Sequence, residues 1–409
     1  MAHAAAEARP VLVESTVNQV NQFGGYTGMT PEDFREFAFG LAPESGLAED
    51  RVLLGADHLG PYPWRGESAG QAMDKACDLA SACVQAGYRK IHLDASMPLG
   101  GDPIGANGGI PAPLVAEREA ALAEAAEHAF AASPPGGSDA PPVYVIGTDV
   151  PPPGGALDEH GIHITRVEEL EETVESCHSA FRERGLEEAW ERVVAVVVQP
   201  GVEFGDHTIY PYRRERARKL CAAARQLPGI VLEGHSTDYQ SPTSLRELVE
   251  DGVAILKVGP ALTFAMREAL FALEHVEGEL CHGRPAAKLS RLGAELEAEM
   301  LARPEHWRGY YRGTEEQLRL ARRYSLSDRS RYYWSAPPLQ AAVTRLLANL
   351  GAAPIPMTLV SQFLPHLAPA VRDGQLEARP PALVEAAVRR TLSDYSHAAG
   401  GTSGSDRHP

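Results

Sequence analysis

The sequence is poor in the residues that build disulfide frameworks and zinc ribbons. It contains five cysteines in 409 residues, and no two of them form a Cys-x-x-Cys pair. An odd number of widely spaced cysteines is typical of reduced thiols in a cytoplasmic protein. The chain also lacks an apolar run of about 18 residues and opens without the apolar core of a signal peptide. We therefore expect no membrane span and a cytoplasmic protein.

Basic residues are the second shortage. The sequence has 38 lysine and arginine residues against 55 aspartate and glutamate residues, which gives a formal net charge of −17 at pH 7. A field of that sign repels nucleic acids and anionic membrane surfaces over long range, so we expect neither as a partner. An anionic small substrate remains compatible with this charge, provided that local cations or backbone N–H groups surround it.

Two glycine-rich motifs that bind nucleotide phosphates are absent as well. No Gly-x-Gly-x-x-Gly segment follows an expected strand, which argues against a dinucleotide-binding, doubly wound sheet. No Gly-x-x-x-x-Gly-Lys-Ser/Thr segment is present either, which argues against a P-loop kinase.

What the sequence does contain is a regular alternation of short apolar runs and longer helical patterns. Runs that are apolar throughout are typical of parallel strands buried on both faces. Their alternation with helices predicts an α/β fold, and we expect a TIM-type (β/α) barrel. Because such a barrel needs eight strands, the count leaves one position unfilled. The expected strands are 11–14, 51–56, 90–94, 143–148, 193–199, 230–233 and 253–258, and the expected helices lie near 67–86, 113–132, 166–185, 211–226 and 242–250.

The pattern changes after about residue 275. We expect the barrel in residues 1–275, a helical C-terminal extension packed on it in 276–395, and a disordered Gly/Ser-rich tail in 396–409. Inside the extension, the basic and aromatic segment 322–334 contains hydroxyl residues that predict a turn. We expect this segment to fold over the barrel rim and to bring Arg329 and Arg331 to a substrate phosphate. The alternative is that its arginines pair with the surplus acids.

Ionisable residues follow the expected strands directly, and a barrel gathers such strand ends on one rim. Aldol cleavage of a ketose needs a divalent ion that polarises the carbonyl group and an acid/base group beside it. We expect Asp57 as the acid/base, with His58 and His235 as ligands and either Glu203 or His207 as the third. Imidazole and carboxylate ligands suit Zn²⁺, and also Mn²⁺ or Co²⁺. The alternative for the first pair is a capping Asp57 and a core His58.

Two further strand ends carry catalytic candidates. His92 and Asp94 face the same side of their strand, because side chains two residues apart do so. Asp94 lies nearer the rim and is the candidate, with Ser96 as a substrate contact, whereas His92 is expected to be a hydrogen-bonded core histidine. Asp149 ends another strand before a Gly-Gly loop and is the remaining catalytic candidate.

The other substrate-binding candidates are amides, hydroxyls and a cation. Asn21 and Gln22 precede a Gly-Gly turn, and amide groups suit the recognition of sugar hydroxyls. Ser236 and Asp238 follow His235 directly. Lys257 ends the last strand, where it is expected either to pair with a carboxylate or to contact a phosphate.

Together, several segments resemble one known family, the Z-type subunit of class II D-tagatose-1,6-bisphosphate aldolase. The resemblance extends from about residue 11 to about residue 390. It implies a zinc-dependent barrel in which Asp57 matches the acid/base aspartate and His58 and His235 match ligands. The segments are NQVNQFGGYTGMT (18–30), DHLGP (57–61), IHLDAS (91–96), QPGVEF (199–204), HSTDYQ (235–240), LKVGPALTFA (256–265) and YSLSDR (324–329).

The sequence departs from the class II pattern in three places. Ser-Thr-Asp follows His235 where that pattern has a glycine-rich phosphate loop, which favours a monophosphate over a bisphosphate. Pro200 and Gly201 stand where the pattern has a His-Gly pair, so the third ligand must come from elsewhere. Members of the family also carry one further strand before the segment that matches Val11, so the expected barrel lacks its first strand.

The resemblance implies one of two functions. The first is metal-dependent retro-aldol and aldol chemistry on a phosphorylated ketohexose. It would either cleave tagatose 1,6-bisphosphate, as a lyase, or interconvert tagatose 6-phosphate and fructose 6-phosphate, as a 4-epimerase. The alternative is a non-catalytic subunit, because Z-type members are described as stabilising partners of a Y-type catalytic subunit. Association with further copies of the chain is also compatible with the sequence. The label of tagatose-6-phosphate kinase, also used for relatives, does not fit a chain without a P-loop.

Overall fold

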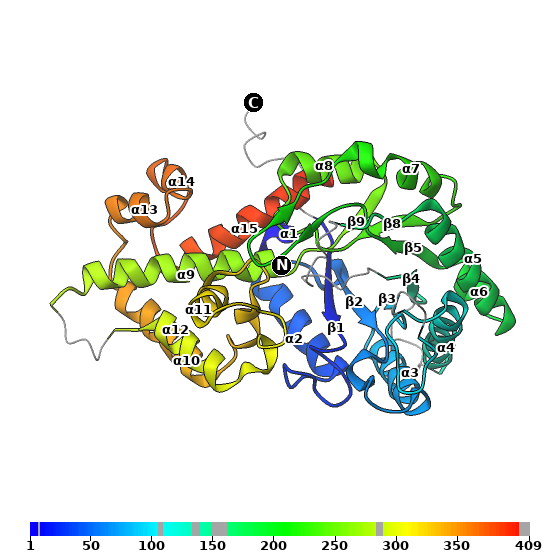
Figure 1. Ribbon diagram of the computed structural model, residues 1–409. Coiled ribbons are helices and arrows are strands. Elements are labelled where there is room, and N and C mark those ends of the chain that lie inside the picture. Colours follow the sequence, from blue (N-terminus) through cyan, green and yellow to red (C-terminus); the bar gives the residue numbers. More distant parts are fainter. Residues whose placement is uncertain (7–8, 105–108, 133–139, 149–161, 284–288, 401–409) are drawn as a thin grey trace.

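The barrel is built from one parallel sheet (Figure 1). The computed structural model describes residues 1–400 except 7–8, 105–108, 133–139, 149–161 and 284–288. Seven strands pair in the order β1-β2-β3-β4-β5-β8-β9, and every pairing in this sheet is parallel. The expected α/β fold class is confirmed. The strands are β1 (Val11–Thr16), β2 (Val52–Leu59), β3 (Lys90–Leu93), β4 (Val143–Ile146), β5 (Val193–Val198), β8 (Val231–Gly234) and β9 (Val253–Leu256).

Helices follow the strands and cover the outside of the sheet (Figure 1). Several begin where the sequence supplies a capping side chain: Thr30 accepts the backbone N–H of Asp33, and Ser68 and Ser241 cap α3 and α8 in the same way. A short antiparallel hairpin of β6 (Glu203–Phe204) and β7 (Ile209–Tyr210) follows β5. The helices are α1 (Ala2–Ala6), α2 (Pro31–Glu44), α3 (Ala69–Gln85), α4 (Ala112–Ala131), α5 (Val167–Glu183), α6 (Glu187–Trp190), α7 (Arg214–Ala224) and α8 (Pro242–Glu250).

The two edge strands leave the barrel open. Among the described residues no strand pairs with the outer edge of β1 or of β9, so the sheet is one strand short of the eight in a closed barrel. The interior strand β3 is buried at all four residues, whereas Leu12 of β1 and Ala254 of β9 are exposed. Apolar strand residues lose water only when a neighbouring strand or helix covers them. The unfilled position therefore lies between β1 and β9, the two strands that lack an outer neighbour among the described residues.

The C-terminal part forms a second hydrophobic core beside the barrel. The long helix α9 runs out from the barrel, and α15 runs back along it and also packs on α8 (Figure 1). The boundary expected near residue 275 falls inside α9, and the tail expected from residue 396 begins within α15. Residues 401–409 lie outside the described part. The helices are α9 (Pro260–Leu280), α10 (Leu292–Ala302), α11 (Glu315–Tyr324), α12 (Pro337–Leu350), α13 (Met357–Phe363), α14 (Ala368–Arg372) and α15 (Pro380–Ala398).

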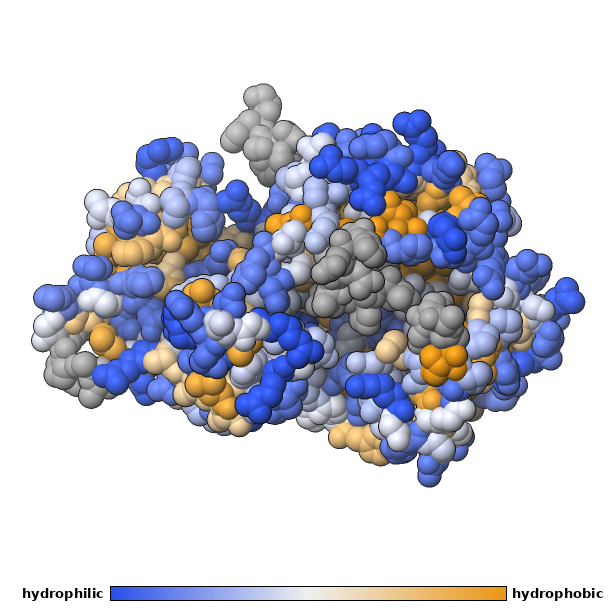
Figure 2. Space-filling view, in the orientation of Figure 1, coloured by the Kyte–Doolittle hydropathy of each residue, from blue (hydrophilic) through white to orange (hydrophobic). Residues whose placement is uncertain are grey.

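The visible surface is mainly hydrophilic. Figure 2 shows hydrophilic residues over most of one face, with smaller apolar patches between them. Within the described ranges, no helix has the length and apolarity needed to cross a membrane.

Candidate active site

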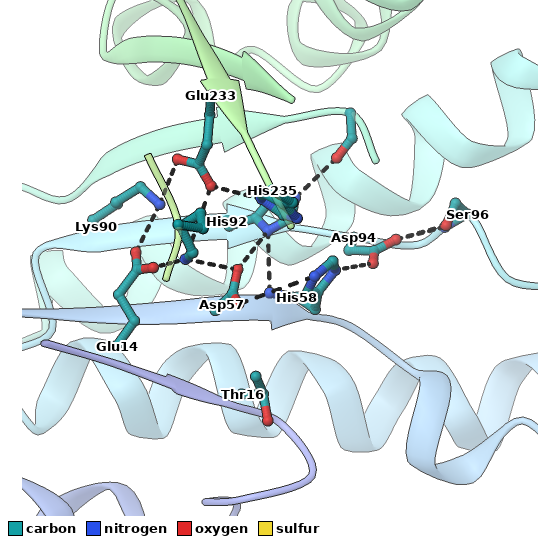
Figure 3. A network of polar contacts seen from close by, with 12 residues as sticks. Glu14, Thr16, Asp57, His58, Lys90, His92, Asp94, Ser96, Glu233 and His235 are labelled. Carbon is teal, nitrogen blue, oxygen red and sulfur yellow. Dashed lines mark hydrogen bonds and ion pairs between the residues drawn. The ribbon is translucent and has the colours of Figure 1, made fainter. Parts of the chain in front are cut away.

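Four side chains converge at the carboxyl ends of three strands (Figure 3). They are Asp57 and His58 at the end of β2, His92 on β3, and His235 directly after β8. Their candidate ligand atoms all lie within 4.8 Å of one another. The ring centroids of His58 and His235 are 4.8 Å apart, and that of His92 lies 4.9 Å from the first and 5.2 Å from the second. The two histidines expected as ligands therefore do meet.

A break in the regular strand lets Asp57 and His58 reach the same space. Neighbouring residues of a strand normally point to opposite faces. Here the register of β2 against β3 shifts between Ala56 and Leu59, and His58 has a left-handed backbone with φ 47°. Such a bulge turns the side chain of His58 toward the same side of the sheet as Asp57. The chain then passes so close to β3 that a Cβ atom on Gly60 would lie 1.7 Å from the Asp94 carbonyl oxygen, so only glycine fits there.

Each imidazole is anchored through one ring nitrogen to an oxygen of the protein. His58 Nδ1 lies 2.7 Å from Asp94 Oδ2, and His235 Nε2 lies 2.9 Å from Glu233 Oε1. His92 Nε2 lies 2.9 Å from the carbonyl oxygen of Gly147. We assign the proton to the anchored nitrogen in each ring, because a carboxylate or carbonyl oxygen only accepts. The other nitrogen of His58 and of His235 then carries a lone pair, as in histidines that bind metal ions. That of His92, Nδ1, also accepts the backbone N–H of His58 at 3.1 Å.

The donor set fits a divalent metal ion. Three imidazoles and one carboxylate are the ligands that Zn²⁺ takes in catalytic sites, and Mn²⁺ or Co²⁺ accept them too. His92 Nδ1 lies 3.1 Å from Asp57 Oδ1, a separation that two ligands of one ion can adopt. His58, His92 and His235 would hold the ion, with Asp57 beside it.

A network of alternating charges fills the barrel directly below this group (Figure 3). Lys90 Nζ lies 2.7 Å from Glu14 and 2.6 Å from Glu233. Lys257 pairs with Glu14 and lies 3.0 Å from Asp57 and 3.9 Å from Glu233. Of the two roles expected for Lys257, the structure shows the carboxylate pairing. Glu14 has room because residue 55 is a glycine, whose Cβ would otherwise meet the Glu14 side chain at 2.8 Å.

These contacts fix the protonation states of the site. Burial alone would raise the pKa of Asp57, but the neighbouring imidazoles, His58 foremost, outweigh it and lower that pKa well below its usual range. Burial would likewise raise the pKa of Asp94, but its contacts with His58, together with His92 and Ser96, outweigh burial and lower that pKa. Burial lowers the pKa of His235. Ionised carboxylates beside a neutral His235 match the state that a metal ion requires of its ligands.

The third histidine replaces the ligand that the sequence suggested. We expected Glu203 or His207 to complete the site, and neither belongs to the group that the structure brings together. The hairpin of β6 and β7 carries the chain away from the end of β5, so His207 is exposed beside its turn. Glu203 is buried, and its Oε1 accepts the backbone N–H of Phe204. His92 is a buried, hydrogen-bonded core histidine, as expected, and it also lies in this group.

The amides expected to bind substrate are engaged in their own loop. Asn21 Nδ2 donates to the Val17 carbonyl, and its Oδ1 accepts the N–H groups of Phe23 and Gly25. Gln22 Nε2 donates to the carbonyl of Lys75. Both side chains therefore help to shape the loop after β1, and their expected contact with substrate stays a prediction.

Of the three candidates near Asp94 and after His235, two are held by hydrogen bonds within the protein and one is not. Ser96 donates to Asp94 Oδ1 at 2.7 Å and so holds a carboxylate that anchors His58. Asp238 accepts the N–H groups of Gly259 and Ala261 and caps the start of α9. Ser236 differs, because its buried hydroxyl has no hydrogen-bond partner among the described residues. Its backbone is also left-handed, with φ 50°.

The segment after α11 lies against the loops at the carboxyl ends of the strands. The Leu326 N–H donates to the carbonyl of Asp206, and the Tyr239 hydroxyl donates to the carbonyl of Leu326 at 2.5 Å. Asp328 is buried and lies 3.0 Å from Arg267 of α9. These contacts put residues 325–331 on the same side of the barrel as the histidines.

Arg329 and Arg331 lie in this segment without an ion pair to a carboxylate in the described part of the chain. Arg329 donates to the carbonyl of His306 and lies over the ring of Tyr310. Arg331 bonds the carbonyl of Ser327 and the hydroxyl of Tyr332. Arg322 instead pairs with two glutamates, as the alternative for this segment had it. Asp149, the last candidate, lies outside the described residues.

Comparison with known proteins agrees with this architecture. A family model described as "D-tagatose-1,6-bisphosphate aldolase subunit GatZ/KbaZ-like" matches residues 1–400. The chain belongs to this family.

Two relatives illustrate how close the family members are. The chain is 46% identical over 392 residues to D-tagatose-1,6-bisphosphate aldolase subunit GatZ of Klebsiella pneumoniae, which covers 95% of this chain and 89% of that protein. It is also similar to a crystal structure from Sinorhizobium meliloti 1021, described as a probable tagatose 6 phosphate kinase. That structure is 45% identical, has a TM-score of 0.88, and covers 97% of this chain and 95% of its own.

Proposed function

We propose that this GatZ/KbaZ-like protein binds one divalent metal ion and catalyses retro-aldol and aldol chemistry on a phosphorylated ketohexose. The observation that carries the proposal is the convergence of His58, His92 and His235, each anchored through one nitrogen, beside the ionised carboxylate of Asp57. A buried group of this composition is costly to assemble without a positive ion at its centre. When bound, the ion supplies polarisation of the ketose carbonyl.

Asp57 is the residue that moves the proton in this proposal. Its carboxylate accepts the proton of the C4 hydroxyl while the C3–C4 bond breaks and the bonding electrons pass to the C2–C3 side. Return of the proton, after the bond re-forms on the opposite face of the aldehyde, gives the 4-epimer. Lys257, 3.0 Å from Asp57, favours the ionised carboxylate that starts the cycle. Asp94 acts indirectly, because it holds His58, and Asp149 remains a further acid/base candidate.

A substrate phosphate would be held by the segment that covers the rim. Arg331 lies over the ring of Tyr332, which in turn is 4.8 Å from the ring of Tyr26 in the loop after β1. Arginine forks match phosphate oxygens, and tyrosine hydroxyls add further donors. We therefore assign the far end of the substrate to Arg329 and Arg331, with the sugar between them and the histidines.

One observation favours a second function, that of a stabilising subunit. After His235, the side chains of Thr237 and Asp238 are bonded to Lys257 and to the start of α9, where a phosphate loop would need open backbone. The relative from Klebsiella pneumoniae is named as a subunit of an aldolase. In this alternative the partner is a Y-type catalytic subunit, and the metal site serves stability.

The decisive experiment measures metal content and turnover on the same preparation. Protein loaded with Zn²⁺, Mn²⁺ or Co²⁺ is incubated with fructose 6-phosphate, tagatose 6-phosphate or tagatose 1,6-bisphosphate, and products are followed by NMR. We expect one bound ion and turnover of at least one sugar, with both lost in His235→Ala. A bound ion without turnover, combined with stimulation of a catalytic partner by this chain, would establish the subunit function instead.

A further inference from the structure

Gln199 lies just beyond the carboxyl end of β5, at the level of the candidate ligands along the strands. It follows β5 directly, and two inward-facing residues of that strand, Ala195 and Val197, pack in a small interior cluster with Val145 of β4. Because side chains alternate along a strand, Gln199 faces the same interior. Parallel pairing of β5 with β8 sets Val197 against Glu233, so Gln199 comes level with His235.

Hydrogen bonds determine which end of the Gln199 amide is the donor. Its Oε1 accepts the backbone N–H groups of Gly201 at 2.8 Å and Val202 at 3.0 Å. Only an oxygen can accept these two bonds, so the other end is the NH₂ group. This Nε2 is buried in a residue that is 3% exposed, and it has no acceptor among the described residues. A buried donor that has lost water and gained no partner is unfavourable.

We propose that Gln199 Nε2 donates a hydrogen bond to an oxygen of the bound ketose, and that it determines which sugars the site accepts. The inference rests on the proposed function, which places a sugar at this rim. A carboxamide binds metal ions through its oxygen, and here that oxygen is already held by two N–H groups. The free end of Gln199 therefore suits a hydroxyl or carbonyl oxygen of the substrate. The unpartnered Ser236 hydroxyl, next to His235, offers a second such contact.

The test compares two glutamines that differ in how fully their amides are bonded. Gln240 is a matched control, because its Oε1 accepts the Tyr212 N–H at 2.9 Å and its Nε2 donates to the Tyr210 carbonyl at 3.0 Å. Wild type, Gln199→Glu, Gln199→Met and Gln240→Met are loaded with Zn²⁺ and checked for metal content. Calorimetry then measures their affinity for tagatose 6-phosphate, fructose 6-phosphate and the 3-deoxy and 4-deoxy analogues. Thermal unfolding without sugar measures stability.

We expect both Gln199 variants to bind the natural sugars roughly 10-fold more weakly, since a site built around a hydroxyl depends on its donor. They should bind the deoxy analogue that lacks the partner oxygen as well as wild type does. Gln240→Met should lose thermal stability while keeping affinity. The inference fails if the Gln199 variants keep full affinity for every sugar, or lose it equally for all the analogues.

Other outcomes separate this inference from the proposed function. Binding that depends on Gln199, without any turnover, would support the contact and remove the catalytic proposal. Turnover with unchanged affinity in both Gln199 variants would do the opposite. If metal-loaded wild type binds none of the sugars, both proposals are overturned.

Discussion

The buried carboxyl group of Glu119 should make the stability of the protein depend on pH. Its carboxyl group is fully buried in α4, where Cys177 donates to Oε2 at 3.1 Å and Oε1 has no hydrogen-bond partner among the described residues. Burial raises the pKa of Glu119 to about 8, against 4.5 for an exposed glutamate. Between these two values the folded protein keeps a proton that the unfolded chain releases. Stability should therefore fall as pH rises through that interval.

The loss in the free energy of unfolding depends on how far apart the two pKa values lie. At about 1.4 kcal/mol for each pH unit between 4.5 and 8, the free energy of unfolding should fall by something on the order of 5 kcal/mol. Glu119→Gln keeps the shape without the titrating proton, so it should be close to wild type in stability at pH 5 and clearly more stable at pH 8. Urea unfolding at four pH values between these limits measures the difference between the two proteins.

A second buried glutamate serves as the control. Glu277 accepts bonds from Ser290 and Asn349, so Glu277→Gln should lower stability without the steep gain at high pH. The reasoning would be refuted if the stability difference between wild type and Glu119→Gln stayed constant across pH. Glu119 would then not carry a proton in the folded protein.

Three further predictions concern the site. Asp57→Asn should keep the bound metal and lose about 100-fold or more in turnover, the usual scale for an acid/base group; unchanged turnover would remove Asp57 from the mechanism. Arg331→Ala should raise the KM for a phosphorylated ketose far more than for the free sugar, and equal effects would argue against a phosphate contact. Lys90→Met removes one of the two cations that Glu14 and Glu233 share and leaves only Lys257 between them, so we expect the free energy of unfolding in urea to fall by about 3–5 kcal/mol; a variant as stable as wild type would contradict this.

The fold was accessible from the sequence because parallel strands and their helices leave long-range patterns. All seven expected strands are present, and all five expected helices appear within a few residues of their predicted bounds. The convergence of Asp57, His58 and His235 followed from the same pattern, since strand ends of a barrel share one rim. The order of strands and helices along the chain was enough to predict that these three residues meet.

The features of the site that could not be predicted depend on the register between strands and on local breaks in that register. The bulge at His58 brings two neighbouring side chains into one space, and periodicity assumes that such breaks do not occur. Predicting that His92 lies beside His58 would have required the register of β3 against β2. The pairing of Lys90 with Glu14 and Glu233 joins strands that are distant in sequence. His207 was misplaced because the hairpin after β5 carries it outward.

The last helix has a consequence for how the protein is made. The Tyr395 hydroxyl donates to the carbonyl of Thr237 at 2.8 Å, and Thr237 stands two residues after His235. The loop that carries one of the three histidines is thus secured by a residue synthesised more than 150 positions later. On a ribosome, the barrel strands would emerge long before this contact can form. High affinity for the proposed ion should therefore arise only after α15 has been synthesised, which limits the time in which a half-made chain can capture an ion.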